Sequence, residues 1–81
     1  MDKQDCRKII GERLRKFRES KKRSIYAVAR KGNIRIDQAK AVEEGITNYT
    51  VDTFIGYIAG PDLNIYFEEN AQSGLMELLK E

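Results

Sequence analysis

Apolar and polar residues alternate with a helical period along the first part of the chain. Between residues 5 and about 20, Ile10, Leu14 and Phe17 lie at positions i, i+4 and i+7, and basic residues fill many of the positions around them. Spacing of this kind places apolar side chains on one face of a helix. The sequence therefore predicts a first amphipathic helix whose charged face points to solvent.

Two shorter helical stretches follow, separated by a tight turn. Ser24 can accept a backbone N–H as an N-cap, and apolar residues at helical spacing come directly after it. Asn33, which follows a glycine, adopts a positive φ at low cost and so permits a chain reversal. A second helix is expected from about residue 36 to residue 44, where Gly45 stops it. The pattern predicts a helix, a turn and a helix, the arrangement called helix-turn-helix.

The helix expected over residues 36–44 has an inner and an outer face. Ala39 and Val42 share the side that packs against the preceding helix, together with Ile34 in the turn. The side chains expected on the outer side are those of Asp37, Gln38, Lys40 and Ala41.

The character of the chain changes near residue 60. Thr50 is a suitable N-cap for a helix in which Phe54 and Ile58 face inward, and Pro61 ends that helix because proline lacks the backbone N–H. Residues 63–67, LNIYF, alternate apolar and polar side chains and are rich in strand-forming types. They are predicted to form one short strand.

A single strand needs a partner, and the chain offers no good candidate. Pairing with the same strand of a second copy would satisfy it and close a two-fold dimer. A last short helix is expected from about residue 73 to residue 81; it packs either on its own domain or in the dimer contact, and the dimer contact is favoured. The residues assigned to dimerisation are Leu63, Ile65, Tyr66, Phe67, Leu75, Leu78 and Leu79.

Charge is distributed unevenly along the chain. Residues 1–31 hold 12 Lys/Arg and 4 Asp/Glu, whereas residues 32–81 hold 3 and 9, although the net charge is only +2. A basic segment on an otherwise acidic domain offers a polyanion one face. The alternative is that these basic residues simply solvate the outer face of the first helix.

Composition narrows the possible classes of protein. A chain of 81 residues has room for one small domain, for which dimerisation is a common source of stability. Histidine is absent and Cys6 is the single cysteine, expected to be a small buried or half-buried thiol. No zinc site, other metal site, cofactor or enzyme activity is therefore expected. Neither a signal peptide nor an apolar run of roughly 20 residues is present, which predicts a cytoplasmic protein without a membrane span.

Residues 9 to about 59 resemble the Cro-like, XRE-class helix-turn-helix repressors of bacteria and their phages. IGERLRKFRESKKRS is similar to that family's first helix, Val42-Glu43-Glu44-Gly45 stands in place of its Ile-Glu-Asn-Gly ending, and NYTVDTFIGYIA resembles its next loop and helix, all without insertion. The resemblance implies an all-α, lambda-repressor-like bundle of four to five helices. Residues 1–60 would form the DNA-binding domain, and residues 61–81 would form a dimerisation extension of it.

The resemblance also implies a set of contacts with double-stranded DNA, with helix 36–44 in the major groove. Base contacts are implied for Arg35, Ile36, Asp37, Gln38, Lys40 and Ala41. Phosphate contacts are expected from Lys21, Lys22, Arg23, Ser24, Tyr26, Thr47, Asn48 and Tyr49. The family further pairs an arginine with a glutamate as a structural ion pair, which here would join Arg18 to Glu43.

Side-chain chemistry fits these positions to different degrees. Gln38 can form two hydrogen bonds with adenine, Ile36 can pack on a thymine methyl group, and Lys40 can reach guanine or a phosphate. For Asp37, stabilisation of the helix start is preferred over a contact with cytosine, because phosphates repel its carboxylate.

Three positions depart from the family pattern: Ile25 replaces a frequent glutamine, Asn33 the turn glycine, and Ala39 a β-branched residue. The expected function is a sequence-specific transcriptional regulator, a repressor acting as a homodimer on a pseudo-palindromic operator. The alternative is an antitoxin-like or accessory subunit that uses the same fold to bind a protein partner. Ile25, Ile36 and residues 63–67 motivate that alternative.

Overall fold

Four helices make up the part of the chain that the structure describes. The computed structural model describes residues 2–67, with α1 at Lys3–Ser20, α2 at Ile25–Gly32, α3 at Ile36–Glu44 and α4 at Val51–Ala59. No strand occurs among these residues, so the all-α prediction is confirmed for them. Helix α1 begins two residues before the predicted start, because Asp2 acts as its N-cap.

Local signals in the sequence account for the helix boundaries. The Ser24 hydroxyl accepts a hydrogen bond from the Ala27 N–H at 3.0 Å and so caps α2, and Thr50 caps α4 in the same way. Asn33 at φ 57° ends α2, and Gly45 at φ 66° ends α3. Both are left-handed conformations that asparagine and glycine adopt most readily.

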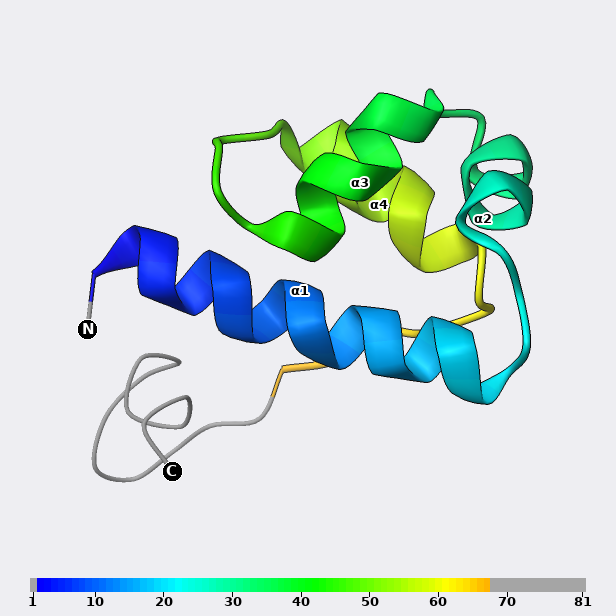
Figure 1. Cartoon of the computed structure of the whole chain (residues 1–81), viewed down its shortest axis with the longest axis horizontal. Helices are drawn as coiled ribbons and strands as arrows, with labels where there is room; N and C mark the ends of the chain where they lie inside the picture. Colours follow the sequence, from blue (N-terminus) through cyan, green and yellow to red (C-terminus); the bar gives the residue numbers. More distant parts are fainter. Residues whose placement is uncertain (1, 68–81) are drawn as a thin grey trace.

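The helices are arranged as one long helix with three short ones above it (Figure 1). Helix α1 packs on α3, α2 packs on both α3 and α4, and α3 packs on α4. Helices α2 and α4 approach each other closely at Gly32 and Gly56, where a Cβ on Gly32 would overlap the backbone carbonyl of Gly56. Two glycines at one crossing therefore allow these helices to meet backbone to backbone.

The core lies where these four helices converge. Ala39 and Val42 are fully buried, as predicted, and Ile58 is buried while Phe54 is half-buried. Tyr57, which the pattern did not single out, is fully buried as well. The buried residues that contact one another are Leu14, Val28, Ala29, Ala39, Val42 and Tyr57.

The prediction for the inner face of α1 was wrong at one position. Leu14 is buried, but the Phe17 side chain is 53% exposed. The adjacent Arg18 takes the place facing α3, because its guanidinium pairs there with Glu43. Phe17 instead borders an apolar groove between α1 and the segment after α4.

The chain after α4 turns back along α1. Helix α4 ends at Ala59, before Pro61, as predicted, and Pro61 is buried. Residues 63–67 have no regular secondary structure. The strand predicted there is thus not found in the described single chain, and its pairing with a second copy stays a prediction. The last helix, with Leu75, Leu78 and Leu79, lies outside the described residues. Within residues 2–67, no helix has the length and apolar character needed to cross a membrane.

Candidate nucleic-acid interface

The residues predicted to contact bases lie at the start and on the outer side of α3. Arg35 precedes the first turn in extended geometry, at φ −78° and ψ 157°, and Ile36 opens the helix. Arg35, Ile36, Asp37 and Lys40 are exposed, whereas Gln38 and Ala41 are half-buried. Four of the six residues for which the family resemblance implies base contacts are therefore accessible, and two are partly covered.

Arg35 and Asp37 form an ion pair at the exposed start of α3. Arg35 Nε donates to Asp37 Oδ1 at 3.0 Å, and Arg35 Nη2 donates to Asp37 Oδ2 at 3.4 Å. This hydrogen-bonded guanidinium lowers the pKa of the Asp37 carboxyl below its ordinary value. The Asp37 carboxylate, which phosphates would repel, therefore has a positively charged partner within the protein.

Gln38 is engaged inside the protein at both ends of its amide group. Its Oε1 accepts from the backbone N–H of Arg35 at 2.9 Å, and its Nε2 lies 3.5 Å from the Thr53 hydroxyl of α4. The first bond is the returning half of a capping box, which satisfies a helix-start N–H. A bidentate contact with adenine needs this same oxygen and nitrogen. The structure therefore gives Gln38 a capping role that the sequence pattern did not indicate.

A hollow lies beside the start of α3, between it and α2. The residues that line it include the exposed Tyr26 and Arg30 of α2 and, opposite them, Arg35 and Asp37. Tyr26 is among the residues predicted to contact phosphate, whereas no DNA contact was predicted for Arg30. The signal that could have found Arg30 is its spacing from Tyr26, because residues four apart share one side of a helix.

A second hollow separates α1 from the end of α3. Its walls carry charges of both signs, from Lys8 and Arg15 on one side and Lys40 and Glu44 on the other. Ile25, the departure at the start of α2, is half-buried in this wall. Its apolar side chain is therefore part of the lining of this hollow.

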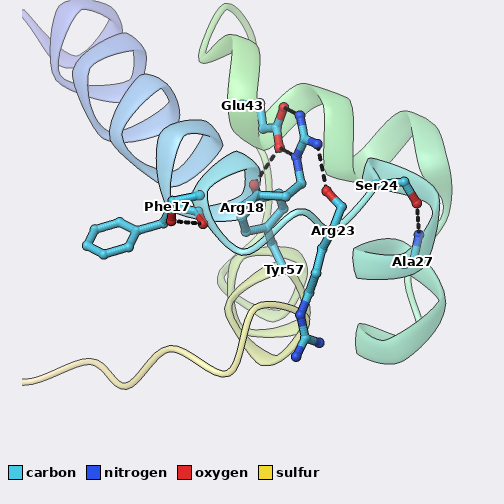
Figure 2. Close-up of polar contacts among 8 residues, drawn as sticks. Phe17, Arg18, Arg23, Ser24, Ala27, Glu43 and Tyr57 are labelled. Carbon is cyan, nitrogen blue, oxygen red and sulfur yellow. Dashed lines mark hydrogen bonds and ion pairs between the residues drawn. The ribbon is translucent and has the colours of Figure 1, made fainter.

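In the basic turn between α1 and α2, two side chains are exposed to solvent and one is hydrogen-bonded within the protein. Lys21 and Lys22 are exposed, and Lys22 has a φ of 57°. Arg23 donates from Nη1 to the Gly60 carbonyl at 2.8 Å and from Nη2 to Asp62 Oδ2 at 2.9 Å. Figure 2 shows the Arg23 side chain running toward the segment after α4, so its guanidinium serves a structural contact.

The Asp62 carboxylate forms ion pairs with two basic side chains and so links α2 to the end of α4. Lys31 pairs with its Oδ1, and Arg23 pairs with its Oδ2. The Lys31 ammonium, followed by the charge of Arg23, lowers the pKa of the Asp62 carboxyl. Part of the N-terminal excess of positive charge is thus neutralised within the domain.

The loop between α3 and α4 is held by Arg7 of α1. The guanidinium donates to the Asn48 side-chain oxygen at 3.0 Å and to the Ile46 carbonyl at 3.2 Å. Tyr49 stacks on Phe54 with ring centroids 6.1 Å apart, and burial raises the pKa of its phenol. Thr47 and Asn48 are exposed and Tyr49 is half-buried. Arg7 therefore positions the loop that contains three of the residues predicted to contact phosphate.

One buried carboxylate joins α1, α3 and α4 beneath this surface (Figure 2). Arg18 donates to Glu43 through Nε at 2.6 Å and Nη2 at 3.2 Å, and its Nη1 donates to the Arg23 carbonyl at 2.9 Å. The Tyr57 hydroxyl donates to Glu43 Oε2 at 2.5 Å. The hydrogen bond that Arg18 donates to Glu43 raises the pKa of Arg18. Burial, and after it the hydrogen bond to Glu43, raises the pKa of Tyr57.

Comparison with protein-family models, with curated proteins and with solved structures finds no match to this chain. Among residues 2–67, no group of three or more histidine, cysteine, aspartate or glutamate side chains has the arrangement of a metal site. Assignment of a function therefore depends on the physical character of the surface around α3.

Proposed function

We propose that α2, the turn at Asn33 and α3 form a helix-turn-helix that binds double-stranded DNA. The observation that supports this proposal most is the outer side of α3. Lys40 is exposed on it, the exposed Arg35 precedes its first turn as the N-cap residue, and Ala39 and Val42 are buried behind it. An α-helix with its side chains is about 10–12 Å in diameter, which fits the roughly 12 Å width of a major groove. On this proposal α3 is the recognition helix.

The flanking residues supply groups that suit phosphate contacts. Lys21 and Lys22 lie exposed before α2, Tyr26 is exposed near its start, and Thr47 lies exposed in the loop after α3. Contacts of this kind fix the position of a protein on DNA without reading the sequence. Arg23 is not assigned to this set, because Gly60 and Asp62 occupy its guanidinium.

We further propose that the protein acts as a homodimeric transcriptional regulator, a repressor, on a pseudo-palindromic site. The support is an apolar groove where Ile10, Leu14 and Phe17 of α1 face Leu63 and Ile65. The exposed Tyr66 and Phe67 extend this surface. In a two-fold dimer the recognition helices would enter successive major grooves about 34 Å apart.

Selection of bound duplexes from a random pool, at two salt concentrations, tests this proposal. Enrichment of a two-fold related motif is expected, with binding that weakens steeply as salt rises. With roughly 6 or more phosphate contacts per dimer, affinity should fall by about three orders of magnitude or more between 50 and 200 mM salt. Failure to enrich any motif would overturn the DNA-binding proposal.

A second candidate function is a protein-binding subunit built on the same helices. The observation that favours it is the row of exposed apolar side chains from Ile65 to Phe67, which reaches 93% exposure at Phe67. Exposed apolar surface of this kind is a feature of protein interaction sites. A pure chain that stays monomeric and enriches no DNA motif, but binds one protein stoichiometrically, would establish this second function instead.

A further inference from the structure

We propose that Arg35 reads a guanine and that Asp37 is the positioning residue that aims its guanidinium. The inference deepens the DNA-binding proposal and rests on it. On this inference the N-cap residue of α3, Arg35, recognises a base, and Gln38, whose side-chain chemistry suits adenine, does not.

The geometry of the ion pair leaves the useful edge of Arg35 open. Asp37 takes the side edge of the guanidinium, formed by Nε and Nη2. The end edge, where one N–H of Nη1 and one of Nη2 point in parallel, has no hydrogen-bond acceptor among the described residues. Two parallel donors of this kind match the O6 and N7 acceptors that guanine presents in the major groove.

The Arg35 backbone is fixed as well as its side chain. Gln38 accepts the Arg35 N–H at 2.9 Å, and Arg35 has the extended conformation of an N-cap. The side chain is 72% exposed and therefore has room for a ligand. A long arginine loses rotamer freedom on binding, so a carboxylate that holds it beforehand lowers that cost.

The ion pair is not explained by stability alone. Both side chains are more than 70% exposed, and pairs between such exposed groups contribute little to folding. An acidic residue in the first turn also favours the helix dipole, but Asp52 of α4 occupies the equivalent second position of its helix without an arginine partner among the described residues. Asp52 is therefore the matched control for Asp37.

The main comparison is among four proteins, the wild type and three variants, on the motif that the wild type selects. Asp37→Glu and Gln38→Ala are measured in addition. For each protein, binding is measured by competition between the selected duplex and duplexes in which each guanine of a half-site is replaced by adenine. The variants are Arg35→Lys, which keeps the charge but removes the two-donor fork, Asp37→Asn and the control Asp52→Asn. Circular dichroism checks that each variant keeps its helix content.

One guanine per half-site should carry the discrimination by the wild-type protein, roughly 10- to 100-fold over adenine. Arg35→Lys should remove most of that preference, and Asp37→Asn should reduce it by about 2- to 5-fold, the range set by the weak attraction within an exposed ion pair, while binding to random DNA does not weaken. Asp52→Asn should keep the full preference. Partial recovery with Asp37→Glu, which restores a carboxylate, would support positioning.

Three outcomes would overturn the inference while the DNA-binding proposal stands. In the first, a motif is enriched but no guanine in it depends on Arg35. In the second, Asp37→Asn and Asp52→Asn change discrimination equally, so that only the helix dipole acts. In the third, Gln38→Ala abolishes the preference and Arg35→Lys does not. A wild-type protein that enriches no motif overturns the proposed function itself.

Discussion

The Tyr57 hydroxyl and the Arg18 guanidinium meet on the same oxygen of Glu43. Tyr57 donates to Oε2 at 2.5 Å and Arg18 Nε donates to it at 2.6 Å, so one carboxylate links α4, α1 and α3. The side chains of Arg18 and Glu43 are only 14% and 7% exposed. Because α3 carries the proposed DNA-binding face, this cluster fixes the scaffold on which that face is displayed.

Replacement of Arg18 by methionine should destabilise the domain strongly. It leaves the Glu43 carboxylate buried with only the Tyr57 hydroxyl as partner, and the loss of one member of a buried pair costs about 3–5 kcal/mol. Urea unfolding monitored by circular dichroism measures the change. The double variant Arg18→Met/Glu43→Gln should recover part of the loss, because no uncompensated charge remains.

The matched control for that experiment is Lys16→Met on the same helix. Lys16 lies 3.6 Å from Glu12, with side chains 69% and 58% exposed, so solvent screens their attraction. The expected change in the free energy of unfolding is below about 1 kcal/mol. Equal losses for Lys16→Met and Arg18→Met would contradict the structural role assigned to the buried pair.

Replacement of Tyr57 by phenylalanine should produce a pH-dependent loss of stability. At neutral pH the variant loses a hydrogen bond to a carboxylate, which is worth about 1.5–3 kcal/mol. Urea unfolding of both proteins from pH 7 to pH 11 measures the difference.

The sign of the pH effect follows from the raised pKa of Tyr57. The folded protein keeps the phenol protonated above pH 10, whereas the unfolded chain begins to lose this proton near pH 10. The stability that Tyr57 contributes is therefore fully present below about pH 10 and decreases as the pH rises further. The difference between wild type and Tyr57→Phe should shrink above pH 10, and a difference that grows there would refute this account.

The helix boundaries could be predicted because their signals are local. Ser24, Asn33, Gly45 and Thr50 each act on the backbone within a few residues, and each lies at the helix end that the pattern indicated. The burial of Ala39 and Val42 follows from helical periodicity for the same reason. Such features need no knowledge of what lies across the core.

Features that depend on distant partners were harder to predict. Nothing in the sequence around Tyr57 shows that its hydroxyl will reach Glu43, 14 positions away. Arg23 looks like its neighbour Lys22 in the sequence, yet its guanidinium is hydrogen-bonded to Gly60 and Asp62 in the structure. The predicted Arg18 pairing came from the family resemblance and not from spacing, and the structure contains that pair.

Lys22 and Arg23 should therefore respond differently to loss of charge. Lys22→Gln should weaken binding to all DNA sequences alike. It should reduce the slope of log affinity against log salt by about 2 for the dimer, because one phosphate contact, worth about 1 in slope, is lost in each subunit. Arg23→Gln should leave that slope nearly unchanged and lower the free energy of unfolding, because it removes the hydrogen bonds to Gly60 and Asp62. Fluorescence anisotropy at four salt concentrations measures the slopes.

Lys16→Gln provides the reference for these slopes. Lys16 is exposed on α1 beside Arg13 and Phe17, outside both hollows that border α3. Its replacement should change neither the slope nor the affinity beyond the general effect of one charge. A slope that falls as much for Arg23→Gln as for Lys22→Gln would show that Arg23 leaves Asp62 to bind phosphate.

Phe67→Asp should weaken self-association if the apolar groove is the contact between two copies. The Phe67 ring is 93% exposed at the end of that surface, and a carboxylate there would have to lose its hydration on burial in a dimer. The expected result is a rise of roughly 10-fold or more in the dimer dissociation constant, measured by sedimentation equilibrium, with parallel weakening of binding to a two-fold DNA site. Val51→Asp is the control, because Val51 is also apolar and 71% exposed but begins α4, where an acidic residue suits the helix dipole. Sedimentation of the wild type as a monomer at every concentration, with Phe67→Asp unchanged, would assign this surface to a different partner.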